Sequence, residues 1–197
     1  MQDAVPDNLY APPAAEIRAP VIPAVAAQPF YVVSTTKFCV LYFATFGLYG
    51  VYWFYVHWQR YRQGRTETIW PVPRAVFSIF FAHALAGRID DQLRLGLRAY
   101  RWSPGLLATI YVVFEITGNL LSRLDSHAIG SPSTGVLGLM TLLPTGLSLM
   151  RMQAAANLAC NDPAGQQNHR FTWANGVWIV LGLLLWLLVA IGLMPPA

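Results

Sequence analysis

The clearest shortage in this 197-residue chain is charge, because only 11% of its residues are Asp, Glu, Lys or Arg. Soluble globular domains carry about a quarter. Hydrophobic residues make up 55% of the chain, and its mean hydropathy is +0.43. This combination excludes an ordinary soluble domain and indicates a membrane protein.

Cysteine and catalytic motifs are also scarce. Cys39 and Cys160 lie far apart, so the sequence has neither a disulfide framework nor metal-ligand spacing. It lacks Gly-x-Ser-x-Gly, His-Glu-x-x-His and phosphate-loop motifs. We therefore expect no metal, no cofactor and a non-enzymatic role. The basic residues stand between apolar segments without a motif that reads bases, which argues against nucleic acid as a partner.

Four apolar stretches approach the roughly 20 residues that a helix needs to cross a bilayer. They cover about residues 38–58, 104–122, 134–150 and 173–194. The last is apolar on every face, as in a membrane-spanning helix. We predict an all-α integral membrane bundle of about four transmembrane helices over residues 35–197. A Pro- and Ala-rich, disordered tail without signal-peptide features is expected over residues 1–34.

The first apolar stretch admits two interpretations. Its sequence, "FGLYGVYWFYVHWQRYR" from Phe46 onward, places tyrosines and tryptophans where a helix leaves the bilayer. Gly47 and Gly50 lie three positions apart, so they predict a notch where a partner helix packs closely. We favour one spanning helix, because non-helical backbone inside a membrane needs protein or water around it. Alternatively, the glycines break the stretch into a re-entrant hairpin.

Between the first and second stretches, residues 74–101 combine a short apolar run with regularly spaced arginines. This pattern predicts an amphipathic helix in the membrane interface, or a short helix buried beneath the spans. Ile89, Leu93 and Leu97 would form its apolar face. Its basic face would contact the phosphates of anionic lipids through Arg88, Arg94, Arg98 and Arg101.

Basic residues are distributed unequally between the two sides of the predicted bundle. Ten of the 13 fall in the connections that follow the first and third stretches. The positive-inside rule assigns these connections to the cytoplasm. With four spans, both termini are then expected in the periplasm, and the protein is expected to be a multi-pass inner-membrane protein.

Two segments resemble a known family. "FYVVSTTKF" followed by "FGLYGVYWFY" carries a Gly-Leu-Tyr-Gly-x-Tyr-Trp signature, and "QAAANLACNDP" precedes "NHRFTWANGVWIVLGLLLWLL". Together they are similar to small bacterial multi-pass membrane proteins of uncharacterised function, over about a third of the chain. The resemblance implies an inner-membrane protein of a Gram-negative bacterium. It implies no activity and no catalytic residues.

Polar residues on the second and third stretches form a predicted intramembrane seam. Glu115 stands inside the second stretch, where a carboxylate is costly. Tyr111 and Asn119 lie one helical turn before and after it, and Thr141 and Thr145 have matching spacing on the third stretch. We expect a neutral Glu115 that hydrogen-bonds between the two helices. A proton or ion relay and a ligand site are the alternatives.

These features favour a protein that acts through interaction, as a subunit or scaffold of another membrane complex. Its expected partners are anionic membrane lipids and either another membrane protein or further copies of itself. One alternative is a small oligomeric channel or transporter with Glu115 on its ion path. The second alternative is a lipid-acting membrane enzyme, for which no nucleophile or metal site is evident.

Overall fold

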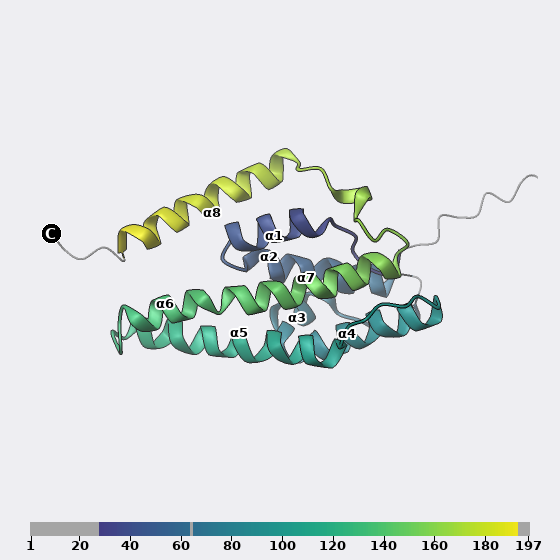
Figure 1. Cartoon of the computed structure of the whole chain (residues 1–197), viewed down its shortest axis with the longest axis horizontal. Helices are drawn as coiled ribbons and strands as arrows, with labels where there is room; N and C mark the ends of the chain where they lie inside the picture. Colours follow the sequence, from purple (N-terminus) through teal and green to yellow (C-terminus); the bar gives the residue numbers. More distant parts are fainter. Residues whose placement is uncertain (1–27, 64, 193–197) are drawn as a thin grey trace, which may run out of the picture.

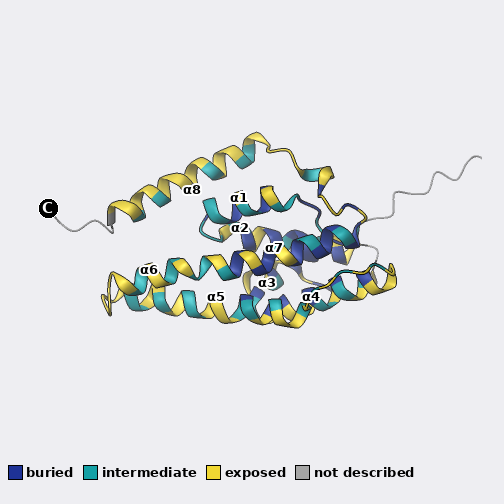
Figure 2. Ribbon diagram, viewed as in Figure 1, coloured by how far each residue is buried: buried dark blue, intermediate teal, exposed yellow. Residues whose placement is uncertain are grey.

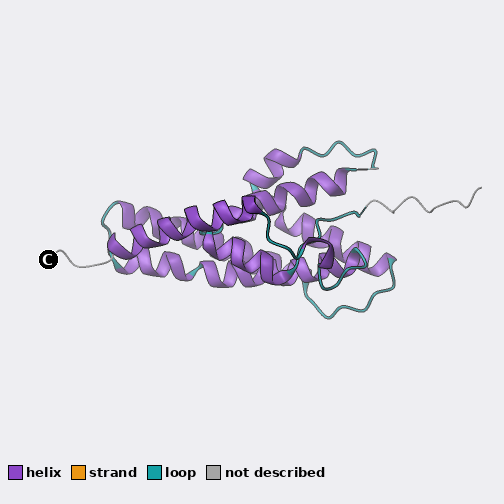
Figure 3. Cartoon of the chain, turned by 90° about the horizontal axis from the view of Figure 1, so that it is seen from above, coloured by secondary structure: helices purple, strands orange, loops and turns teal. Residues whose placement is uncertain are grey.

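The computed structural model describes residues 28–63 and 65–192, and all their regular secondary structure is helical (Figures 1 and 3). The all-α bundle predicted from the sequence is therefore confirmed. In chain order the helices are α1 (Thr35–Ala44), α2 (Leu48–Arg62), α3 (Pro71–Val76), α4 (Ser78–Leu95), α5 (Pro104–Ser126), α6 (Ser133–Met140), α7 (Leu142–Ala159), the 3₁₀ turn η1 (Gln166–Asn168) and α8 (Trp173–Gly192).

Three of the predicted spans correspond to helices that are long and apolar enough to cross a membrane. These are Pro104–Ser126, Ser133–Ala159 and Trp173–Ile191. The second combines α6 and α7. Pro144 does not end it, because this residue lies in the first turn of α7, where its missing N–H is not needed. The outward faces of α5 and α8 are largely exposed and apolar (Figure 2), as lipid-facing surfaces should be.

The single spanning helix predicted for residues 38–58 is wrong, because this stretch forms the hairpin of α1 and α2. Phe46 and Gly47 adopt left-handed backbone conformations, with φ of 53° and 82°. Thr45 supports the turn: its hydroxyl donates to the Leu41 carbonyl (2.7 Å) and accepts from the Tyr49 N–H (3.0 Å). The alternative of a hairpin therefore describes the observed backbone.

The tip of this hairpin packs against the middle of α8. The Phe46 and Trp186 rings stack with centroids 4.1 Å apart, and Trp186 Nε1 donates to the Phe43 carbonyl (2.9 Å). On the other side, Gly50 lies beside Tyr42 and within reach of Leu149 of α7. Both glycines of the predicted notch are thus at close contacts, since Gly47 lies beside Tyr42 and Leu142, and Gly47 also makes the turn.

The predicted tail boundary is too late in the sequence. Residues 1–27 lie outside the described residues, but residues 28–34 are part of the core. Phe30 and Val33 are fully buried, and the Phe30 ring stacks on Tyr61 near the end of α2 (5.7 Å). The described chain therefore begins at the end of the bundle where α2 finishes. A four-span arrangement would have placed these two points at opposite ends.

Of region 74–101, for which one amphipathic or short buried helix was predicted, only Ser78–Leu95 forms a continuous helix, α4, and α3 precedes it. Ile89 and Leu93 are buried as expected, but α4 ends at Leu95, and Leu97 is 95% exposed. The left-handed backbone at Leu97 turns the chain away from the helix direction. Arg98 and Arg101 therefore do not continue the face that carries Arg88 and Arg94.

The four arginines have separate surroundings. Arg88 pairs with Glu67 at 3.5 Å, and Arg94 pairs with Asp90 at 2.8 Å. Arg98 donates to the carbonyls of Leu158 and Ala159 and so caps the end of α7. Arg101 is exposed. Lipid contact at these residues stays a prediction, although it would not use a single basic helix face.

Candidate functional site

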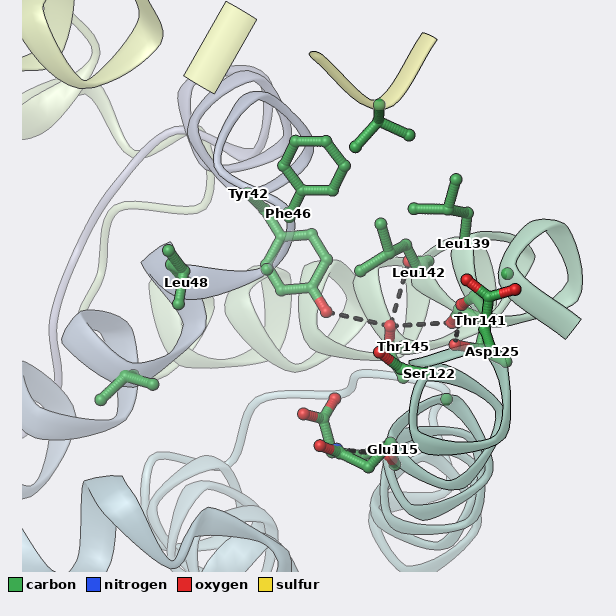
Figure 4. A pocket seen from close by; sticks show the side chains of 17 residues that line it. Tyr42, Phe46, Leu48, Glu115, Ser122, Asp125, Leu139, Thr141, Leu142 and Thr145 are labelled. Atoms are coloured by element: carbon green, nitrogen blue, oxygen red, sulfur yellow. Dashed lines mark hydrogen bonds between the residues drawn. The ribbon is translucent and has the colours of Figure 1, made fainter. Parts of the chain in front are cut away.

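A cleft of about 620 Å³, with polar side chains in a mostly apolar lining, opens between α5, the α6–α7 helix and the tip of the α1–α2 hairpin (Figure 4). We call it the Glu115 cleft. Its polar lining comes from Tyr42 of the hairpin, from Thr141 and Thr145, and from Glu115, Asn119, Ser122 and Asp125 of α5.

The four α5 residues form one stripe because they are separated by four, three and three positions. Glu115 lies at the middle of α5, and Asp125 lies at its end next to the turn into α6. Ten residues of helix correspond to a rise of about 15 Å. The stripe therefore lines the cleft from mid-helix to the end of the bundle where α5 and α6 connect.

The hairpin and α7 meet at the inner end of the cleft. The Tyr42 hydroxyl donates to Thr145 Oγ1 at 2.9 Å, and the Thr145 hydroxyl lies 2.9 Å from the Thr141 carbonyl and 3.0 Å from that of Leu142. Tyr42 and Thr145 are both buried, with exposed fractions of 2% and 1%. This contact forms part of the cleft wall near Glu115 (Figure 4).

The structure brings four of the five predicted seam residues together. Glu115, Asn119, Thr141 and Thr145 all line the cleft, but Tyr111 does not. The Tyr111 hydroxyl instead lies 2.7 Å from Ser78 Oγ at the start of α4. The sequence correctly placed Tyr111 on the same helix as Glu115, but it predicted that Tyr111 would face the α6–α7 helix. Tyr111 faces α4 instead, because α4 covers that turn of α5.

The predicted hydrogen bond between Glu115 and α7 is not formed. Thr141 donates to the Gly138 carbonyl at 2.6 Å, and Thr145 is occupied by Tyr42 and its own helix. Asn119 Nδ2 bonds the backbone carbonyl of Glu115 (2.8 Å) rather than its carboxylate. Within the described residues, the Glu115 carboxyl thus makes neither an ion pair nor a hydrogen bond to α7; it lines the cleft with the Asn119 side chain beside it.

A glycine sets the distance between the two walls. At Gly118, one turn after Glu115, an added Cβ would collide with the Thr141 side chain. Only glycine lets α5 and α6 approach this closely without a shift of Thr141. The width of the cleft next to Glu115 therefore depends on this position.

A second polar cluster, which the sequence did not reveal, lies inside the opposite half of the bundle. Gln153 Oε1 accepts from Trp53 Nε1 and lies 3.2 Å from His57 Nε2, while Gln153 Nε2 donates to Asn157 Oδ1 (2.6 Å). Asn157 in turn bonds both backbone groups of Val33. These side chains are fully buried. They fasten residues 28–34 to α7, so we interpret the cluster as structural.

Metal binding finds no support in residues 28–63 and 65–192, where no group of three or more His, Cys, Asp or Glu side chains could hold an ion. The fold and the site thus define a helical membrane protein with a cleft that extends from the end of α5 to its middle. Comparison with protein-family models, curated proteins and solved structures gives no match.

Proposed function

We propose that this protein is a small bacterial inner-membrane transporter that binds a cation or a proton at Glu115. The observation that carries the proposal is a carboxyl group at the middle of an apolar helix, lining a cleft and without an ion-pair partner among the described residues. Carboxylates at such depth are costly and typically mark ion pathways or proton relays. A cation or proton would compensate the charge.

The cleft supports access from one side only. The polar stripe leads from Asp125 to Glu115, and we propose that the Tyr42–Thr145 contact beside it acts as a gate. The α1–α2 hairpin and the buried aromatic core occupy the other half of the bundle. This arrangement favours a binding site with gated transfer over an open pore. Release toward the second side would require the hairpin to move.

The charge distribution supports an orientation for this transport. The arginine-rich connection between α2 and α5 is proposed to face the cytoplasm by the positive-inside rule. The cleft then opens toward the periplasm. Because residues 28–34 lie beside the end of α2, we propose a cytoplasmic start of the described chain, in place of the periplasmic one expected from four spans.

The test is reaction of the purified protein with a hydrophobic carbodiimide, which modifies protonated carboxyls inside membranes. Modification should occur at Glu115 and should slow when the transported cation is added or when pH is raised. In liposomes, Glu115→Gln should abolish cation or proton uptake and leave thermal stability within about 0.5 kcal/mol, because glutamine keeps the size of the side chain and an oxygen that can accept a hydrogen bond.

A matched control is Glu67→Gln, which removes an exposed carboxylate outside the cleft. It should leave both uptake and modification unchanged. Normal uptake by the Glu115→Gln protein, or a wild-type protein without uptake of any cation tested, would refute the transport proposal. Loss of stability in Glu115→Leu, together with normal uptake and stability in Glu115→Gln, would instead favour the structural role expected from the sequence.

A second candidate function is that of a subunit in a larger membrane complex, and α8 is the observation that favours it. Only 6% of the apolar window in this helix is buried, and its contacts with the other helices are concentrated at α1. A partner helix could cover the rest. Purification in mild detergent, followed by identification of co-purifying proteins and cross-linking from Leu184, tests this role. Cross-links to lipid alone would contradict it.

A further inference from the structure

A separate groove of about 800 Å³ lies between the hairpin, α3 and the beginning of α8. Its volume is within the range of about 300–1,000 Å³ that is typical of small-molecule sites. Its lining is predominantly apolar, with a few polar groups gathered around Lys37. We call it the α1–α8 groove. It adjoins the Glu115 cleft at Leu48 and Val51, which line both, but Lys37 and Glu115 belong to different pockets.

Lys37 is the only lysine of the chain, and its side chain is only 3% exposed. Its ammonium donates to Asn168 Oδ1 and to the Arg170 carbonyl, both at 2.7 Å. Both acceptors are neutral. The ion pairs of the described chain are Arg88–Glu67 and Arg94–Asp90, so no described carboxylate balances this charge. An ammonium has three donors, of which these two acceptors use two, and the Phe171 ring centroid lies 6.0 Å from Lys37 Nζ.

The helices around Lys37 reinforce the positive potential. Lys37 lies in the first turn of α1, where the helix dipole is positive and no acidic residue is present. The α8 helix begins at the same groove, since Thr172 and Asn175 line it and Thr172 accepts from the Asn175 N–H. A buried cation between two helix N-termini favours an anionic group.

The polar partners of Lys37 are held in a fixed arrangement. Asn168 Nδ2 donates to the Tyr31 hydroxyl at 2.9 Å, and this hydroxyl lies 3.3 Å from that of Tyr49. Tyr31 and Tyr49 both line the groove. Their hydroxyls can therefore assist Lys37 in contacting the oxygen atoms of a ligand.

The lining of the groove changes from polar to apolar along α1. The distance from Lys37 to the hairpin turn at Thr45 corresponds to a helix rise of about 12 Å. At that far end the lining includes Leu48, Val51 and Trp178, which are between 45% and 61% exposed. The groove is thus open at its apolar end, where an acyl chain can enter sideways from the bilayer.

We propose that the α1–α8 groove binds one anionic phospholipid, with its phosphate at Lys37 and an acyl chain along α1 toward Leu48. The charge of Lys37 matches the phosphate, and the lateral opening matches a ligand that arrives within the membrane. This site is independent of cation binding at Glu115. It also differs from the lipid contacts predicted for Arg88, Arg94, Arg98 and Arg101.

The test is native mass spectrometry of the full-length protein in detergent, titrated with phosphatidylglycerol or with phosphatidylcholine of identical acyl chains. Wild type should bind phosphatidylglycerol about fivefold more tightly, the effect of one well-placed basic residue. Lys37→Gln should remove this preference, and Lys37→Arg should retain part of it. Arg151→Gln, which removes an exposed charge of α7, should leave it unchanged.

Ala174→Trp provides a second variant that leaves Lys37 in place. Ala174 lines the groove near the start of α8, so a bulky side chain should lower the binding of both lipids. The proposal would be overturned if wild type bound the two lipids with equal affinity. It would also be overturned if Arg151→Gln lost the preference for phosphatidylglycerol as completely as Lys37→Gln. Displacement of the lipid by millimolar inorganic phosphate would show a site for the free anion instead. If Lys37→Gln fails to fold, undiminished binding by Ala174→Trp would still refute the groove.

Discussion

Replacing Asn157 by leucine should release the first described segment of the chain from the bundle. Asn157 Nδ2 donates to the Val33 carbonyl at 2.9 Å, and Asn157 Oδ1 accepts from the Val33 N–H at 3.3 Å and from Gln153 Nε2 at 2.6 Å. Leucine has a similar size but makes none of these bonds. Asn157 and Val33 are both fully buried, so water cannot replace the lost partners.

The expected cost follows from the groups left without a partner. Both backbone groups of Val33 lose their bonds to Asn157, whereas Gln153 Nε2 keeps its bond to the Tyr31 carbonyl (3.0 Å). An unsatisfied buried polar group costs about 1–3 kcal/mol. With some gain from the apolar leucine, the free energy of unfolding should fall by about 3 kcal/mol. For a chain of this size, that corresponds to a Tm lower by roughly 10 °C.

Thermal unfolding in detergent measures this loss, and hydrogen exchange at residues 28–34 locates it. Exchange there should accelerate more than in α5. The matched control is Gln167→Leu, which replaces an exposed amide bonded only to Gln28 and should change stability by less than about 0.5 kcal/mol. An Asn157→Leu protein with wild-type Tm and protected residues 28–34 would refute the argument.

Three further predictions concern the hairpin, a buried thiol and the orientation of the bundle. Gly47→Ala should lower stability by about 1–2 kcal/mol because φ is 82° there, whereas Gly176→Ala, in open space on a helix, should be neutral or stabilising; thermal unfolding compares them. Burial raises the pKa of the Cys160 thiol to about 11. At pH 8, maleimide should therefore react with Cys160 on the order of a hundredfold more slowly in the folded protein than after unfolding, and the reaction should become faster as pH rises. Rapid labelling of Cys160 in the folded protein would contradict this. Reporter fusions after Gly130 and Gln166 should report opposite sides of the membrane, and a shared side would exclude a spanning α6–α7 helix.

Several features of the fold were predictable because they depend on single segments. The length and uniform apolarity of residues 173–194 are sufficient to predict α8, whatever its neighbours are. Pro104 marks the start of α5 because proline suits the first helical turn. The one-sided spacing of Glu115 and Asn119 likewise follows from helix periodicity alone.

The α1–α2 hairpin was not decided by its own sequence. An aromatic, apolar stretch with two glycines is compatible with one spanning helix or with two short ones. The choice depends on distant contacts, such as Tyr42 with Thr145 and Phe46 with Trp186, which stabilise the tip. A pattern within residues 38–58 contains no information about these partners.

The composition and periodicity of the sequence by themselves determined the helical class, three apolar spans and a polar stripe around Glu115. Only the tertiary structure decided that Glu115 faces an open cleft, that Tyr111 contacts α4, and that Asn157 holds residues 28–34. The physical reason is that periodicity describes one face of one helix. A hydrogen bond or a cleft depends on which second face packs against it, and that is set by the whole bundle.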